Sequence, residues 1–306
     1  MENNNGLNFC LIMNPAAGSV KKLSSRKNLT DKLQADFFSA TGTELPIYET
    51  LYPGHATLLA KESAAAGFSA CLAMGGDGTM NEVASGLLGT QTALGFIPMG
   101  SGNGLARHLG YDMDPIRALR QCLKAFRVQA DVGKCGERYF FLAAGMGFEG
   151  TVAHAFAKQK ERGFFQYIRS SAINFFHYRA ETFSFEADGK KETVSPFTLT
   201  MANGSQYGNN AIIAPGASVC DGQLELVVIC EFPFWAAPWL FFRLMNGSIS
   251  RSVYHESSKV RSLVFHLEKP SEGHLDGEPV VFDGRLEFSV LPAAVTLLSP
   301  KKAGEI

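Results

Sequence analysis

The sequence predicts an α/β protein of two domains, an N-terminal Rossmann-like parallel α/β domain at residues 1–130 and a C-terminal, mainly antiparallel β domain at residues 131–298. The chain has 306 residues, and at roughly 150 residues per domain this length favours two domains. Strand and helix patterns alternate up to residue 128, whereas strands dominate afterwards. Residues 299–306 could complete the first domain. With 46% hydrophobic and 19% charged residues, intrinsic disorder is excluded.

Short apolar runs and helical patterns alternate in the first domain. Strands are expected at Phe9–Met13, in a run that ends at Met74, and at Ala93–Ile97. Helices are expected from about Ser24 to Phe38, from Thr79 to Leu88, and after Asp114. Asp114 is the expected cap of this last helix and Pro115 lies in its first turn, where proline is tolerated. Its apolar face is predicted to contain Ile116, Leu119, Leu123 and Phe126. The alternation predicts a parallel sheet.

The second domain has the alternating patterns of short strands. The expected strands are Arg138–Ala144, Glu181–Ala187, Val194–Ala202, Gln223–Ile229, Lys259–Leu267 and Arg285–Leu298. Residues 187–190, with the sequence ADGK, predict a hairpin turn. Only Glu149–Lys160 and Phe164–Tyr178 have helical spacing in this part of the chain.

Charge and cysteine usage exclude several classes of protein. The 28 basic and 29 acidic residues give a net charge of -1, so nucleic acid is not expected as a partner. The six cysteines contain no Cys-x-x-Cys pair, which favours a reducing, cytoplasmic compartment. The N-terminus is acidic and rich in amides, unlike a signal peptide. The longest apolar stretch, Val227–Leu244, contains charges and prolines, so we expect no transmembrane helix.

Three glycine-rich loops each follow a predicted strand of the first domain, at residues 14–18, 75–79 and 98–104. Because the carboxyl ends of parallel strands meet at one edge of a sheet, these loops are expected to lie together. Glycine lets backbone amides approach an anion closely, and a helix N-terminus supplies further donors. The loops therefore predict a phosphate site.

These loops match neither the P-loop nor the dinucleotide-binding fingerprint. Asp77 lies among the glycines, beside the predicted phosphate. A carboxylate in such a place is costly unless a cation or a network of donors compensates it. We therefore expect Asp77 to be linked to Mg²⁺.

Four segments together carry a family resemblance. They are NP at residues 14–15, GGDGTMNEV at 75–83, PMGSGN at 98–103 and LDGEP at 275–279. In this order they resemble the diacylglycerol kinase catalytic-domain family, which includes bacterial lipid kinases, sphingosine kinases and ceramide kinases. The resemblance covers essentially the whole chain. It implies a two-domain fold similar to that of NAD kinases, ATP in the cleft between the domains, and a lipid alcohol as phosphoryl acceptor.

The resemblance also implies ligand-binding positions. The nucleotide would contact Asn14, Pro15, Ala16, Ala17, Gly18, Thr50, Gly75, Gly76, Asp77, Gly78, Thr79, Met80, Asn81 and Ser101. A structural Mg²⁺, as in bacterial members, would be held by Ser218, Asp221 and Gln223. Two positions depart from the family pattern, because Gly104 and Cys220 stand where many members have an acid. Asp131 matches the family's acid at the domain junction, or is an ordinary residue at a strand end.

Asp276 and Glu278 flank Gly277 between predicted strands. Residues two apart in a strand share a face, so both carboxylates could point the same way. Phosphoryl transfer to an alcohol needs an acceptor for the hydroxyl proton. We expect this acidic pair to supply it, with Asp77 as the alternative base, and the sequence does not decide between Asp276 and Glu278.

The seven histidines have no metal-ligand spacing, so a histidine-bound metal is not expected. His266 and His274 flank the polar segment 269–272 and are interpreted as loop residues.

The first functional hypothesis is a lipid kinase that depends on ATP and Mg²⁺. Its alternatives are an NAD kinase and a catalytically silent lipid or nucleotide carrier, although a carrier would be expected to lack Asp77 or the acidic pair. The lipid itself stays open among diacylglycerol, phosphatidylglycerol, sphingoid bases and polyprenyl alcohols. We further expect transient, peripheral membrane contact through the aromatic segments 164–178 or 232–242.

Overall fold

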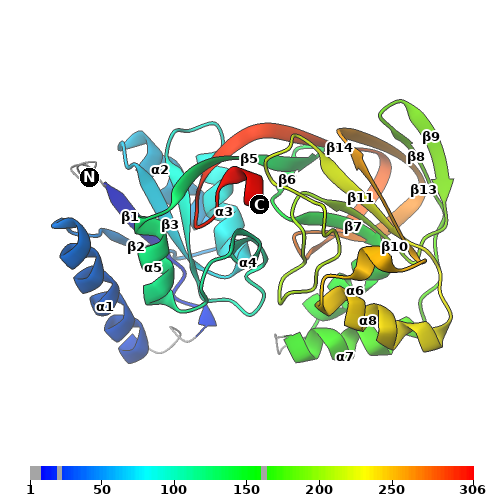
Figure 1. The fold of residues 1–306 in the computed structure, drawn as a ribbon, viewed down its shortest axis with the longest axis horizontal. Helices are drawn as coiled ribbons and strands as arrows, with labels where there is room; N and C mark the ends of the chain where they lie inside the picture. The colour runs from blue at the N-terminus through cyan, green and yellow to red at the C-terminus, as the bar shows by residue number, and fades with distance from the viewer. Residues whose placement is uncertain (1–7, 19–22, 160–163) are drawn as a thin grey trace. The chain divides into compact units, whose positions relative to one another are not determined.

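The computed structural model describes residues 8–18, 23–159 and 164–306 (Figure 1). The chain forms two compact units, Met1–Ala130 with Ala293–Ile306, and Asp131–Pro292. The return to the first unit thus begins at Ala293, earlier than the sequence analysis places it. The predicted combination of an α/β unit and a β-rich unit is confirmed. None of the described helices is long and apolar enough to span a membrane.

The first unit is built on a parallel sheet. Its strands lie in the order β2 (Ile47–Glu49), β1 (Phe9–Met13), β3 (Ala70–Gly75), β4 (Ala93–Pro98), followed by the last part of β14 (Glu278–Ser299). Every residue of β1, β3 and β4 is buried, as expected for parallel strands covered on both faces. The chain crosses from β2 past β1 to β3, so the carboxyl ends of β1 and β3 flank the point where the strand order reverses.

Helices cover both faces of this sheet. They are α1 (Leu23–Thr41), α2 (His55–Ala65), α3 (Asp77–Leu87), α4 (Gly104–Leu109) and α5 (Pro115–Leu123). The Cys71 side chain of β3 hydrogen-bonds to Ser63 of α2. Its neighbour Leu72 lies on the other face, beside Gly95 and Cys122 of α5. Helix α2 packs on α3, and α1 packs on α5, which gives the doubly wound arrangement seen in Figure 1.

The start of α5 agrees with the sequence prediction and its end does not. The Asp114 carboxylate accepts hydrogen bonds from the backbone N–H groups of Ile116 and Arg117, as an N-terminal cap does. The helix ends at Leu123, and Phe126 begins β5 (Phe126–Cys135) instead of continuing the apolar face. Phe126 is 45% exposed, so its spacing from Leu119 and Leu123 was a coincidence of the helical period.

The second unit is an antiparallel β structure. Its main strands lie in the order β12 (His255–Val260), β11 (Leu224–Ile229), β10 (Thr198–Ala202), β7 (Ala143–Gly147), β13 (Ser262–Leu275) and β14. The predicted hairpin joins β8 (Phe183–Ala187) to β9 (Lys190–Val194), and β6 (Arg138–Phe140) pairs with β5. The core between them is rich in phenylalanine: Phe140, Phe183, Phe185, Phe265, Phe282 and Phe288.

Three predicted strands of this unit are each divided in the structure, and one helix was not predicted. The run Arg138–Ala144 becomes β6 and β7, Val194–Ala202 becomes the end of β9 and all of β10, and Lys259–Leu267 becomes the end of β12 and the start of β13. Helices α6 (Phe148–Ala157) and α7 (Phe164–Phe175) correspond to the predicted ones. Helix α8 (Ala237–Met245) was missed, because Pro238 suggests a break although it lies in the first turn, where proline is compatible with a helix.

Candidate functional site

The three glycine loops lie together at the carboxyl ends of β1, β3 and β4. The Asn14 amide Nδ2 donates to the Thr79 hydroxyl Oγ1 at 3.1 Å, which joins the first loop to the second. The Met99 N–H donates to the Gly75 carbonyl at 2.8 Å, which joins the third loop to the second. The structure therefore brings together the segments that the sequence singled out.

Contact between these loops requires glycine at specific positions. A Cβ on Gly100 would lie 2.7 Å from the Gly76 Cα, and one on Gly102 would lie 2.8 Å from Asp77 Oδ2. Gly18 has a left-handed φ of +48°, and a Cβ there would overlap the Met99 carbonyl oxygen. These glycines allow backbone to approach backbone, in addition to leaving amides open to a ligand.

Asp77 connects the second and third loops. Its Oδ1 accepts the Gly104 N–H at 2.6 Å and its Oδ2 accepts the Asn103 N–H at 2.8 Å. Burial raises the pKa of this carboxyl, while the two N–H groups and the charge of Arg107 act in the opposite direction. The sequence analysis allowed either a cation or a network of donors to compensate the charge of Asp77. The structure shows the donors. Asp77 begins α3 and its carboxylate also anchors the start of α4.

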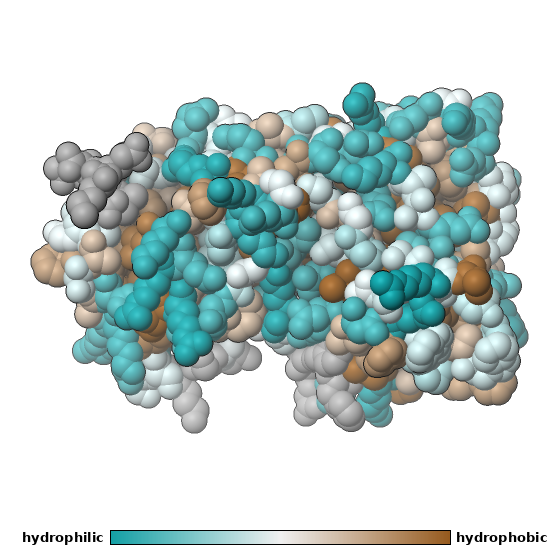
Figure 2. Space-filling model, viewed as in Figure 1, coloured by the Kyte–Doolittle hydropathy of each residue, from teal (hydrophilic) through white to brown (hydrophobic). Residues whose placement is uncertain are grey.

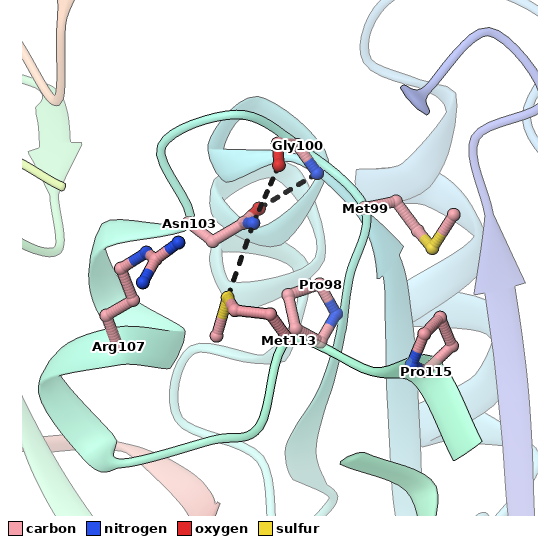
Figure 3. Close-up of a pocket in the computed structure, with 7 residues that line it drawn as sticks. All are labelled: Pro98, Met99, Gly100, Asn103, Arg107, Met113 and Pro115. Atoms are coloured by element: carbon pink, nitrogen blue, oxygen red, sulfur yellow. Dashed lines mark hydrogen bonds between the residues drawn. The ribbon is translucent and has the colours of Figure 1, made fainter. Parts of the chain in front are cut away.

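The third loop borders a hollow of about 240 Å³. Asn103, with a left-handed φ of 49°, donates to the Gly100 carbonyl at 2.7 Å and accepts the Gly100 N–H at 2.9 Å (Figure 3). Arg107 donates from Nε to the Gly102 carbonyl at 3.0 Å. The lining residues are Pro98, Met99, Gly100, Asn103, Arg107, Met113 and Pro115. Asn103 and Arg107 were not among the predicted site residues. The sequence feature that could have indicated them is a polar residue at the start of a helix with a basic residue one turn later.

The remaining predicted nucleotide positions differ in accessibility. Ala16, Gly78 and Ser101 are exposed, and Asn14, Pro15, Ala17 and Asn81 are partly buried. The Thr50 N–H donates to the Met13 carbonyl at 2.9 Å, so Thr50 lies beside the first loop. The Met80 side chain is buried in the core, which leaves only its backbone for contact with a ligand.

In the second unit, Asp276 and Gly277 form the two-residue turn between β13 and β14. Leu275 and Glu278 are paired across this turn, and the central residues have φ values of 49° and 82°. An Asp-Gly pair with two positive φ values is typical of a tight hairpin. The two acids therefore do not share a strand face, because Asp276 lies in the turn and Glu278 begins the next strand.

The two carboxylates have different surroundings. Asp276 accepts three backbone N–H groups, from Phe141 at 2.7 Å, Leu142 at 2.8 Å and Ala143 at 3.0 Å. Burial raises its pKa, and these three donors oppose the rise. Glu278 is exposed, and no hydrogen bond joins its carboxylate to the described part of the chain. Asp276 is thus an anchor of the turn, whereas the Glu278 carboxylate is open to solvent.

His274 was interpreted as a loop residue, and this was wrong. It lies in β13, is 5% exposed, and is hydrogen-bonded through both ring nitrogens. Nε2 is 3.1 Å from Glu149 Oε2, and Nδ1 accepts the Gly277 N–H at 3.2 Å. The sequence analysis missed Glu149, the acid in the first turn of α6. An acidic residue is common at this position of a helix, and the sequence does not show whether it is buried.

The loop proposed for a structural metal is held by protein groups. Asp221 Oδ2 lies 2.5 Å from Lys259 Nζ, and Oδ1 accepts the Gln223 N–H at 3.0 Å. Ser218 Oγ accepts the Cys220 N–H at 3.3 Å, and Asp131 accepts the Gly222 N–H at 2.6 Å. Residues 8–18, 23–159 and 164–306 contain no group of three His, Cys, Asp or Glu that could hold a metal. The arrangement does not fit Mg²⁺, because an ammonium group is already paired with Asp221.

Comparison with known proteins identifies similar chains. The model of the diacylglycerol kinase catalytic domain matches residues 8–135, and that of the YegS C-terminal NAD kinase beta sandwich-like domain matches residues 143–299. A "Probable lipid kinase YegS-like" protein of Pseudomonas aeruginosa (strain UCBPP-PA14) is 32% identical over 85% of this chain and 86% of its own.

Two further proteins match almost the full chain. A "Diacylglycerol kinase" of Bacillus subtilis (strain 168) is 27% identical over 96% of this chain and 97% of its own. The crystal structure of a diacylglycerol kinase from Bacillus anthracis str. Sterne superimposes with a TM-score of 0.73 over 98% of both chains at 20% identity, which supports the same fold.

Replacement of Gly100 by alanine is expected to separate the loops. The added Cβ would meet the Gly76 Cα at 2.7 Å, so the loops must move apart and ATP affinity, measured by calorimetry, should fall by at least tenfold. Gly304→Ala is the matched control, since nothing lies within 4 Å of a Cβ at that position. Equal ATP affinity in the two variants would show that loop contact is unimportant.

Removal of divalent cations should leave the second unit unchanged. Because Lys259 pairs with Asp221 and Asp221 in turn raises the pKa of Lys259, we expect the same melting temperature in EDTA and in excess Mg²⁺. Lys259→Met removes the ammonium group, so this variant should melt at a lower temperature and gain stability from added Mg²⁺. If EDTA lowers the melting temperature of the wild type, a metal ion does bind at this loop.

Proposed function

We propose that this chain, which belongs to the lipid kinase family that carries the diacylglycerol kinase catalytic domain, transfers the γ-phosphate of ATP to the hydroxyl of a lipid alcohol such as diacylglycerol. The observation that carries the proposal is the packing of the three glycine loops against one another, with the Asp77 carboxylate joining the second loop to the third. ATP would be used as its magnesium complex, so that Mg²⁺ arrives with the substrate.

The loops of the first unit would bind the ATP phosphates. The N-terminus of α3, an 11-residue helix, begins within the second loop and carries the positive end of its dipole. Arg107 adds a positive charge beside the third loop. Transfer of a phosphoryl group passes through a loose transition state, so catalysis requires position and charge neutralisation more than covalent chemistry. A fixed set of backbone donors is suited to that task.

Glu278 would accept the proton of the lipid hydroxyl. The hydroxyl oxygen would bond to the γ-phosphorus, the bond from that phosphorus to the ADP oxygen would break, and the proton would move to Glu278. Asp276 is less suited, because both of its oxygens already accept backbone N–H groups. Its proposed role is to hold the turn that precedes Glu278.

The lipid would be reached at a membrane surface through an aromatic patch. The patch consists of Phe234, Trp235, Trp239, Phe241 and Phe242, each of them exposed, on α8 and the turn before it. Figure 2 shows hydrophobic residues, in brown, near the place that α7 and α8 take in Figure 1. Phe232 of the same segment packs in the core instead. Large exposed aromatic side chains next to one basic residue, Arg243, favour an interfacial position.

The kinase proposal is tested with labelled ATP, Mg²⁺ and a total lipid extract, followed by identification of the labelled lipid. Glu278→Gln should lower kcat by roughly 10² to 10⁴ while ATP binding and melting temperature stay unchanged, because Glu278 is exposed. Asp276→Asn should instead lower the melting temperature, since an amide nitrogen cannot accept a backbone N–H and each unpaired group costs about 1–3 kcal/mol. A fully active Glu278→Gln variant would show that Glu278 is not the proton acceptor.

Membrane contact is tested by sedimentation with phosphatidylethanolamine–phosphatidylglycerol vesicles containing diacylglycerol. Complete burial of a large apolar side chain contributes about 1.5–3 kcal/mol, so Trp235→Ser with Trp239→Ser should weaken binding at least tenfold. The control is Val253→Ser, at an exposed apolar residue outside the patch. Binding should persist when ionic strength rises from about 0.1 to about 1 M, and its loss with salt would argue for an electrostatic contact.

A further inference from the structure

We propose that His274 is a positioning residue for the reaction, which holds Gly277, and through it the adjacent Glu278, in a fixed place. The inference rests on the proposed role of Glu278 as the proton acceptor. Asp276 anchors one side of the turn through three backbone N–H groups. His274 contacts the other residue of the turn, Gly277.

The hydrogen bonds of His274 define its tautomer. Nδ1 accepts the Gly277 N–H at 3.2 Å, so this nitrogen carries no hydrogen. The hydrogen of the neutral ring is then on Nε2, which donates to Glu149 Oε2 at 3.1 Å. A histidine whose second nitrogen donates to a carboxylate is fixed in both tautomer and orientation. Glu149 therefore determines which nitrogen is presented to Gly277.

Glu149 is itself held rigidly. It is 6% exposed, and Oε1 accepts the Thr200 hydroxyl hydrogen at 2.8 Å. The Tyr207 hydroxyl lies 2.7 Å from the Thr200 hydroxyl and also hydrogen-bonds to Glu149. A buried carboxylate is stable only when such donors surround it.

Glycine makes room for this network. A Cβ on Gly145 would overlap the Glu149 carboxylate, and one on Gly150 would overlap the backbone carbonyl of Glu272 in β13. The first turn of α6 can therefore approach β13 closely enough for Glu149 to reach His274. These contacts require a specific arrangement of α6, β7 and β13, which a histidine that merely fills the core would not need.

The hydrogen bond of His274 lies close to Glu278 in the chain. Gly277 has a φ of 82°, and Glu278 is the next residue along the chain. The Gly277 N–H belongs to the peptide between Asp276 and Gly277, so its hydrogen bond to His274 limits rotation of the peptide one residue before Glu278. Since a misplacement of about 1 Å at a reacting group can cost roughly 10² in rate, loss of this bond should affect turnover more than substrate binding.

Two substitutions separate the contacts of His274. The Asn side-chain oxygen can take the place of Nδ1 and accept the Gly277 N–H, whereas the Gln side-chain amide can take the place of Nε2 and donate to Glu149. We expect His274→Asn to retain kcat within about threefold, and His274→Gln to lose roughly 10² in kcat, with the KM for ATP unchanged in both. If His274 only fills space, the two variants should have equal kcat, and that result would overturn the proposal.

The tautomer is tested without activity. Nitrogen-15 NMR of histidine-labelled protein should show His274 with hydrogen on Nε2 and a hydrogen-bonded, unprotonated Nδ1, and the opposite tautomer would also overturn the proposal. Failure of the proposed function has a different signature: the wild type would label no lipid, or Glu278→Gln would be fully active. Failure of this inference would appear in an active wild type that needs Glu278, with equal rates for the two His274 variants.

Discussion

A carboxylate that is removed from water remains charged only where hydrogen-bond donors surround it, and both loop regions of this protein depend on that constraint. In the first unit, Asp77 accepts the N–H groups of Asn103 and Gly104, which joins the second glycine loop to the third. In the second unit, Asp276 accepts three successive N–H groups from residues 141–143. Each carboxylate thus joins a turn or a helix start to a second segment of the same unit.

Close approach of backbone to backbone is the second requirement, and it explains where glycine occurs. A Cβ on Gly100 would lie 2.7 Å from the Gly76 Cα, and Gly145 leaves space for the Glu149 carboxylate. In each case a side chain at the glycine would displace a neighbouring segment. The glycines of the motifs therefore serve the packing of the protein, and the open amides that could bind phosphate are a consequence of the same geometry.

The acidic residues divide into anchors and free groups. Asp276 accepts three backbone N–H groups and Asp221 is paired with Lys259, whereas Glu278 is exposed and has no hydrogen-bond partner among the described residues. A sequence motif presents these acids as equivalent, because residue type and spacing carry no information about which oxygens are occupied. The distinction between a hydrogen-bonded and a solvent-exposed carboxylate follows from the donors around each one.

The sequence alone determined the fold class, the order of most elements and the presence of three loops at one edge of a parallel sheet, because hydrophobic period, caps and glycine are local signals. Asp114 and the turn at residues 187–190 were predictable for that reason. Tertiary structure decided the rest. The left-handed Asp276, the helix α8, the end of α5 before Phe126, the burial of His274 beside Glu149 and the pairing of Asp221 with Lys259 depend on segments far apart in the chain. Contacts over such separations determine which polar groups are satisfied, and no pattern of neighbouring residues records them.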